Sequence, residues 1–122
     1  MILADTSVWI DHFRAIDQSM QKLLGNGQIL MHPMVAAELA LGSLRDRGRT
    51  LTELDALRQV RVARLGEIRR MIEAYSLYAK GIGLTDAHLI ASCLLTPGIM
   101  LWTRDNALKS AAQALGVLAI VP

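Results

Sequence analysis

Short apolar runs alternate along the chain with longer segments in which apolar residues recur at helical spacing. The short runs predict buried strands at residues 2–5, 28–31, 99–103 and 118–121. The longer segments predict helices at residues 7–13, 17–24, 33–44, 65–79, 86–95 and 105–115, and leucines at helical spacing run through 46–60. This alternation predicts an α/β fold, a central parallel sheet of short strands flanked by helices.

Residues that start or stop helices stand at several of these boundaries. Thr6 or Ser7 is placed to cap the first helix, and Thr85 to cap the helix at 86–95. Pro33 fits the first turn of the helix that follows it. No internal repeat, low-complexity segment or linker is evident, so residues 1–122 are expected to form a single domain with a substantial core.

The composition narrows the class of protein. A hydrophobic content of 52% against 20% charged residues excludes a disordered chain. The apolar stretches are far shorter than the roughly 20 residues that span a bilayer. Met1 leads directly into an apolar run, so no signal peptide is expected. The lone cysteine, Cys93, lies on an apolar segment and is expected to be buried and reduced, as in a cytoplasmic protein.

Arginines crowd the middle of the chain although the net charge is only +2. They are Arg45, Arg47, Arg49, Arg58, Arg61, Arg64, Arg69 and Arg70. Such a run commonly marks solvated helix faces. Arginine also suits phosphate geometry, so the same residues are compatible with a surface that faces nucleic acid. The sequence leaves both interpretations open.

Four acidic residues stand among apolar neighbours, where a carboxylate is costly to bury without a positive partner. They are Asp5, Glu38, Asp86 and Asp105. Asp5 ends one predicted strand and Asp105 follows another, and ligands of open α/β sheets bind beyond the carboxyl ends of the strands. The fold is therefore expected to bring these acids together.

Each acid also has a structural interpretation. Asp5 could cap the helix after it, and Asp86 and Asp105 could stabilise helix N-termini through the helix dipole. Glu38 lies in mid-helix with apolar neighbours at every short helical spacing, which is hard to reconcile with a solvated position. Glu38 therefore favours a shared site over three separate caps.

Converging carboxylates repel one another unless a cation neutralises them, and all-oxygen ligands select Mg²⁺ or Mn²⁺. Zinc is disfavoured because no histidine or cysteine forms a spaced ligand pair. His88 is expected to pack or cap, whereas His12 and His32 are expected at ordinary surface or half-buried positions. A Mg²⁺ site without a phosphate-binding loop suits hydrolysis of a phosphodiester.

Four stretches of the chain resemble, in order, the motifs of PIN-domain nucleases. They are Ile2-Leu3-Ala4-Asp5-Thr6-Ser7, Ala36-Ala37-Glu38-Leu39, Gly83-Leu84-Thr85-Asp86-Ala87-His88-Leu89-Ile90-Ala91 and Leu101-Trp102-Thr103-Arg104-Asp105. The size of the chain is similar to that of the VapC toxins of bacterial type II toxin–antitoxin systems. The resemblance spans nearly the whole chain, and four motifs in the right order make it specific.

The resemblance implies a Mg²⁺-dependent endoribonuclease that cuts particular RNAs, often tRNA or rRNA. It also implies a homodimer and a small antitoxin protein whose C-terminal segment lies over the active-site groove. DNA would be contacted only through that antitoxin.

The same resemblance implies roles for individual residues. Asp5, Asp86 and Asp105 would hold the metal, with Glu38 as a ligand directly or through water. Thr6 and Thr103 would orient carboxylates or bound water through hydroxyl hydrogen bonds.

Two other functions remain compatible with the sequence. One is a non-catalytic PIN-fold binding module that works in an antitoxin–DNA repressor complex, in which the acids are mostly structural. The other is a Mg²⁺-dependent phosphatase or DNase, which differs from the ribonuclease only in its substrate.

Overall fold

Four short strands form one parallel sheet in the order β3-β2-β1-β4. The computed structural model describes every residue from Met1 to Pro122. The strands are β1 (Ile2–Ala4), β2 (Ile29–Met31), β3 (Arg58–Gln59) and β4 (Met100–Trp102). In the middle of the sheet Leu3 pairs with Leu30 on one side and with Leu101 on the other. The predicted α/β fold with a central parallel sheet of short strands is confirmed.

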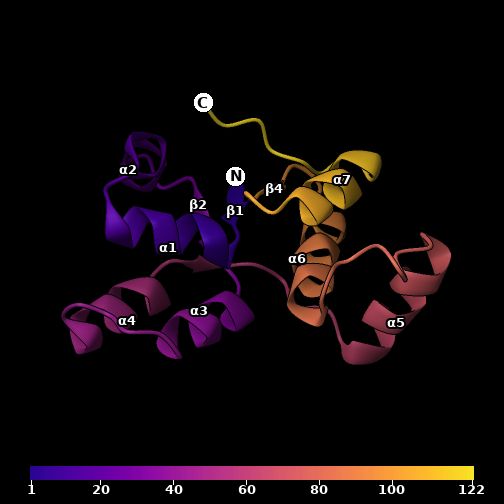
Figure 1. Cartoon of the computed structure of the whole chain (residues 1–122), viewed down its shortest axis with the longest axis horizontal. Helices are drawn as coiled ribbons and strands as arrows, with labels where there is room; N and C mark the ends of the chain where they lie inside the picture. Colours follow the sequence, from indigo (N-terminus) through magenta and orange to yellow (C-terminus); the bar gives the residue numbers. More distant parts are fainter.

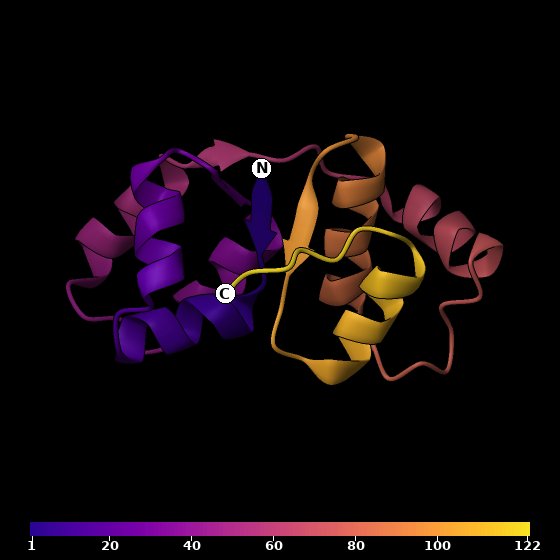
Figure 2. The same cartoon turned by 90° about the horizontal axis from the view of Figure 1, so that it is seen from above.

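Seven helices surround the sheet. They are α1 (Thr6–Arg14), α2 (Gln18–Gly25), α3 (Pro33–Ala40), α4 (Arg47–Asp55), α5 (Leu65–Ala74), α6 (Leu84–Leu95) and α7 (Asn106–Ala114). Helices α1 to α4 gather on one side of the strands and α5 to α7 on the other, as both Figure 1 and Figure 2 show. None of these helices has the length and apolar character needed to cross a membrane.

One hydrophobic core joins the two groups of helices through the sheet. Leu3 and Leu101 contribute from the strands, and both are fully buried. Helix α6 is buried over the continuous stretch 87–93, so it passes through the core instead of lying on its surface. Cys93 belongs to this stretch and is a buried free thiol, which confirms its predicted place.

Several predicted boundaries were wrong for identifiable reasons. Helix α3 ends at Ala40 and not near residue 44. Helix α5 ends at Ala74 and not at residue 79, because Ser76 and Ala79 adopt left-handed backbone angles, with φ of 52° and 56°. The predicted strand at 118–121 is only a single bridge, from Leu118 to Leu101.

The segment at 46–60 also differs from its prediction. Its helix ends at Asp55, and Arg58–Gln59 form the edge strand β3. The leucines at helical spacing gave no sign of this strand. The predicted cap at Thr85 was wrong as well, because α6 already begins at Leu84 and Gly83 is its N-cap. Pro33 does occupy the first turn of α3, as predicted.

Candidate active site

Asp5 lies where β1 ends, beside the end of β4. Its backbone N–H donates to the carbonyl of Trp102 at 2.8 Å, so the residue after each strand faces the same edge of the sheet. The residue is only 6% exposed. Its carboxylate accepts three hydrogen bonds, from the Thr6 N–H at 2.7 Å, the Ser7 hydroxyl at 3.1 Å and the Thr103 hydroxyl at 2.7 Å. These donors offset the cost of burying the charge and fix the orientation of the carboxylate.

Thr103 joins Asp5 to Asp105. While its hydroxyl donates to Asp5 Oδ2, its Oγ1 accepts the backbone N–H of Asp105 at 3.1 Å. Asp105 in turn caps α7, since its Oδ1 accepts the N–H of Leu108 at 2.8 Å. Asp105 is exposed, and its Oδ2 accepts no hydrogen bond from the protein. Thr103 therefore couples the positions of two of the candidate acids.

Glu38 reaches the same region from α3. Its Oε1 accepts the Thr6 hydroxyl at 2.6 Å, which ties α3 to the start of α1. The side chain is exposed, while Val35 and Leu39 carry the buried face of the helix. The prediction that apolar neighbours leave Glu38 no solvated position was therefore wrong. Its exposed position nevertheless leaves the carboxylate accessible to a ligand.

Asp86 lies in the first turn of α6 and is partly buried. Burial raises the pKa of its carboxyl, and the negative charges of Asp5, Asp105 and Glu38 raise it further. A hydrogen bond at 3.1 Å from the Gly83 N–H to Asp86 Oδ2 acts in the opposite direction. The other three candidate acids therefore lie within electrostatic range of Asp86.

The acids are near one another without forming a closed ligand set. No three His, Cys, Asp or Glu side chains are close enough together to hold a metal ion as they stand. Three oxygens nonetheless accept no hydrogen bond from the protein, namely Asp86 Oδ1, Asp105 Oδ2 and Glu38 Oε2. Unsatisfied oxygens that share excess negative charge fit a hard divalent cation. The helix-capping roles of Asp5 and Asp105 are real, but they use only part of each carboxylate.

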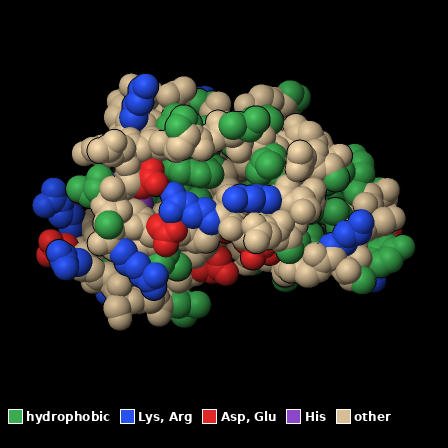
Figure 3. All heavy atoms as spheres, turned by 45° about the horizontal axis from the view of Figure 1, so that its top comes forward, with side chains coloured by type: hydrophobic (Ala, Val, Ile, Leu, Met, Phe, Trp, Pro, Cys, Tyr) green, Lys and Arg blue, Asp and Glu red, His purple; other side chains and the backbone are tan.

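Figure 3 shows how acidic and basic side chains are distributed on one face of the molecule. On the face drawn in Figure 3, acidic side chains gather near the middle of the molecule, between its two halves. Basic side chains border them on the same face.

Two residues near the site were missed from the sequence. The Ser7 hydroxyl donates to Asp5 and its Oγ accepts the N–H of Arg104 at 3.4 Å. The Arg104 guanidinium forms ion pairs with Asp11 and Asp17, each at 2.7 Å. Both residues lie inside the motif stretches, directly beside Thr6 and Thr103, so their position in the sequence was the available signal.

Two histidines lie buried between α3 and α6. His32 has no exposed surface and caps α3, because its Nδ1 accepts the Met34 N–H at 3.0 Å. Its predicted surface or half-buried place was therefore wrong. Burial, and then the neighbouring His88, lower the pKa of His32 to about 4. The two ring centres lie 5.7 Å apart, so His88 packs, as predicted.

Comparison with known proteins agrees with this arrangement. Residues 2–114 match the family described as the PIN domain. The chain is also 44% identical over 117 residues to Ribonuclease VapC32 of Mycobacterium tuberculosis, in the CDC 1551 / Oshkosh and the ATCC 25618 / H37Rv strains. The aligned part covers 96% of this chain and 94% of each relative. The chain therefore belongs to the PIN-domain family, and its sequence is VapC-like.

Proposed function

We propose that the protein is a metal-dependent endoribonuclease that hydrolyses RNA phosphodiester bonds as the toxin of a type II toxin–antitoxin pair. The observation that carries this proposal is the placement of the acids at the carboxyl edge of the sheet, where the Thr103 hydroxyl joins Asp5 to Asp105 and Thr6 joins Glu38 to the start of α1. Asp86 lies near enough for their charges to raise the pKa of its carboxyl, after the larger effect of burial. The name of the mycobacterial relative, a ribonuclease, supports the reaction and the substrate class.

Asp5, Glu38, Asp86 and Asp105 would hold Mg²⁺ or Mn²⁺ through their carboxylate oxygens. Such an ion, when bound, lowers the pKa of water and offsets negative charge that develops at the scissile phosphate. Thr103 and Thr6 fix the orientation of Asp5 and Glu38 through their hydroxyl groups. Burial is the largest cause of the raised pKa of Asp86, and a bound cation would offset only the smaller part that comes from Asp5, Asp105 and Glu38.

A toxin of this kind would act together with a partner protein. A cognate antitoxin would neutralise the protein, and contact with DNA would occur only through that antitoxin. We also propose that the protein works in the cytoplasm as a homodimer. The buried free thiol of Cys93 supports a reducing compartment.

The decisive experiment is RNA cleavage by purified protein with Mg²⁺, with Mn²⁺ and with a chelator, followed by mapping of the new RNA ends. We expect cleavage only with metal, and we expect Asp5→Asn to reduce it to background. Asp55→Asn is the matched control, because Asp55 is an exposed aspartate at the end of α4. Equal cleavage by the Asp5 variant, or cleavage in the chelator, would show that the site is wrongly assigned.

A non-catalytic binding module is the second candidate, and one observation favours it. Asp5 and Asp105 each accept hydrogen bonds that cap helices, so both have a structural role that requires no metal. In that case a double variant Asp5→Asn, Asp86→Asn would keep its effect on growth when induced in cells. Loss of the growth effect in a variant that still folds would favour the nuclease.

A further inference from the structure

Two neighbouring histidines each bury a nitrogen atom that has no hydrogen-bond partner in the protein. These atoms are Nε2 of His32, the residue after β2, and Nδ1 of His88 on α6. His32 is fully buried and His88 is only 9% exposed, and the ring planes meet at 64° with their centres 5.7 Å apart. A buried polar atom without a partner costs free energy, so native proteins rarely leave one unsatisfied.

The helix cap at α3 determines which nitrogen of His32 carries the proton. Its Nδ1 accepts the N–H of Met34 at 3.0 Å, so Nδ1 presents a lone pair. Because the pKa of His32 is about 4, the ring is neutral at neutral pH and its single proton lies on Nε2. The unpartnered Nε2 is therefore a hydrogen-bond donor that needs an acceptor.

His88 can supply the complementary group. Its Nε2 is absent from the buried unpartnered atoms and forms no hydrogen bond with the protein, so it keeps contact with solvent. A proton on Nε2 finds its partner in that solvent, which leaves Nδ1 free to accept. The two unpartnered nitrogens are then one donor and one acceptor.

The chemistry of the pair selects the ligand between the rings. A metal ion does not fit, because His32 has no free lone pair and no third His, Cys, Asp or Glu is close enough to complete a site. The two nitrogens also form no hydrogen bond with each other. A water molecule fits, since it can accept from one ring and donate to the other, and buried waters occupy such positions in proteins.

The histidines belong to the two helices that carry Glu38 and Asp86. His32 is the N-cap of α3, on which Glu38 lies. His88 follows Asp86 by two residues on α6. A link between the two rings would therefore join these helices close to two of the candidate metal ligands.

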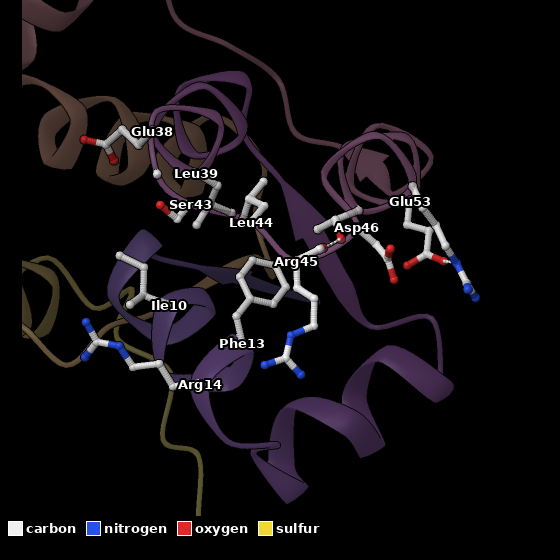
Figure 4. Close-up of a pocket in the computed structure, with 13 residues that line it drawn as sticks. Ile10, Phe13, Arg14, Glu38, Leu39, Ser43, Leu44, Arg45, Asp46 and Glu53 are labelled. Carbon is white, nitrogen blue, oxygen red and sulfur yellow. Dashed lines mark hydrogen bonds and ion pairs between the residues drawn. The ribbon is translucent and has the colours of Figure 1, made fainter.

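Glu38 depends on α3 for its position. In Figure 4 it lies at one end of the pocket beside α3, turned away from Phe13 and Arg45. The Thr6 hydroxyl is its one hydrogen-bond partner. The side-chain hydrogen bonds of α3 and α6 all lead to other segments, so none of them joins the two helices. The spacing of Glu38 and Asp86 therefore depends on how α3 and α6 are held together in the core.

We propose that one buried water molecule links His32 Nε2 to His88 Nδ1, and that this link sets the spacing of Glu38 and Asp86. Both histidines are positioning residues in this arrangement, since neither contacts the metal. The inference rests on the proposed function and adds to it the contact that holds two of the ligands at the right distance.

A crystal structure that resolves ordered water tests the link directly. We expect one water oxygen at about 2.7–3.2 Å from both nitrogens. Rings that bond directly to each other, or the lack of any water in contact with both, would overturn the proposal.

Paired substitutions test the same link in solution. His32→Asn keeps an acceptor for the helix cap but loses the Nε2 donor, and His88→Leu loses the acceptor. Each change should lower the melting temperature, and the double variant should lose clearly less than the sum of the two, because either change alone breaks the link. His88→Asn, whose amide oxygen can stand near the position of Nδ1, should recover most of the loss. Additive losses would contradict the link.

Binding of Mn²⁺ tests the positioning role without RNA, through the rise in melting temperature on adding the metal. His88→Leu and His32→Asn should each weaken Mn²⁺ binding about tenfold, while His88→Asn should bind nearly as well as the unaltered protein. Met20→Ala is the control, because Met20 is fully buried on α2, a helix that carries no candidate ligand. If this control weakens Mn²⁺ binding equally, the effect is general destabilisation and the positioning role is wrong.

The outcomes separate this link from the proposed function. If the unaltered protein binds Mn²⁺ and cuts RNA, and both histidine variants bind Mn²⁺ as well as it does, the positioning role is wrong and the nuclease stands. If the unaltered protein neither responds to Mn²⁺ nor cuts RNA, the proposed function and the positioning role fail together. The crystal structure and the double variant then still decide whether the water link exists.

Discussion

In the candidate site, the side chains of Thr103 and Asp5 are held in place by several hydrogen bonds. Asp5 is the one buried carboxylate of the four, and the Thr103 hydroxyl is one of the three donors that hold it. The same hydroxyl accepts the Asp105 N–H. One oxygen atom therefore links the orientation of two candidate metal ligands.

Replacing Thr103 with valine removes this oxygen without changing the shape of the side chain. We expect Thr103→Val to lower the free energy of unfolding by about 1–3 kcal/mol, because a buried charged acceptor loses a donor. Metal affinity should fall by about 10- to 100-fold, as for other residues that orient ligands. Urea unfolding and metal titration of RNA cleavage measure the two effects. Thr103→Ser, which keeps the hydroxyl, should restore both, and a serine variant as impaired as valine would contradict the role.

His32 predicts how stability depends on pH. Its pKa lies near 4 in the folded protein, below the ordinary 6.5, so the unfolded chain binds the extra proton between these values. The contribution of His32 to stability is therefore complete above about pH 6.5 and declines as the pH falls toward 4, by up to about 3 kcal/mol. Urea unfolding across this range should show a shallower pH dependence for His32→Asn, which retains a side-chain acceptor for the helix cap. Identical slopes would contradict this assignment.

At the scale of elements, Arg104 connects the loop after β4 with the opposite group of helices. Its two ion pairs reach Asp11 on α1 and Asp17, the N-cap of α2. The guanidinium also lies 5.9 Å from the centre of the Trp102 ring. The loop that carries Thr103 and Asp105 is thereby fastened to the half of the molecule that contributes Asp5.

Removing this connection should affect geometry more than stability. We expect Arg104→Met to lower the unfolding free energy by only about 1 kcal/mol, because the paired groups are partly exposed and solvent-screened. RNA cleavage should fall more steeply, since the loop loses its tether. Arg49→Met is the control, because it breaks the exposed pair with Glu53 on α4. If both variants retain full kcat, Arg104 has no positioning role.

The central strands were predictable because each is a continuous run of apolar residues. The buried runs around Leu3, Leu30 and Leu101 were predicted as strands, and they form the centre of the sheet. The edge strand β3 was missed because Arg58 and Gln59 are both exposed and show no alternation. The end of α5 was also hidden, since Ser76 adopts a left-handed conformation that the sequence would signal only for glycine or asparagine.

The proximity of the candidate acids was partly predictable from the sequence, whereas their geometry was not. Parallel strand ends explain why Asp5 and Asp105 lie near each other, and the structure confirms that proximity through Thr103. The exposure of Glu38 was not predictable, because it depends on which face of α3 packs inward. Ion pairs such as those of Arg104 join distant segments, and residue spacing alone does not encode them.

At the scale of the whole molecule, the charge on Asp86 lowers the stability of the folded protein. The raised pKa of Asp86 means that its charged form is disfavoured by folding, so stability falls as the pH rises through that pKa. Neutralising the residue should therefore stabilise the metal-free protein.

We expect Asp86→Asn to raise the melting temperature in the presence of a chelator at neutral pH. The same variant should gain less than the unaltered protein when Mg²⁺ or Mn²⁺ is added, because a ligand is lost. Differential scanning calorimetry with and without metal measures both effects. A lower melting temperature in the chelator would contradict the repulsion described here. Asp55→Asn, at an exposed site outside this group, serves as control.

The strand order also has a consequence for synthesis of the protein. Strand β1 is made before the other strands, yet one of its two neighbours in the sheet is β4, the last strand to be made. A nascent chain that stops before Met100 lacks the partner of β1 on that side and leaves Leu3 without Leu101. Asp5 also lacks the Thr103 hydroxyl at that stage. Chains in which β4 and Thr103 have not yet been made should therefore be inactive, so that activity begins only after this segment is translated.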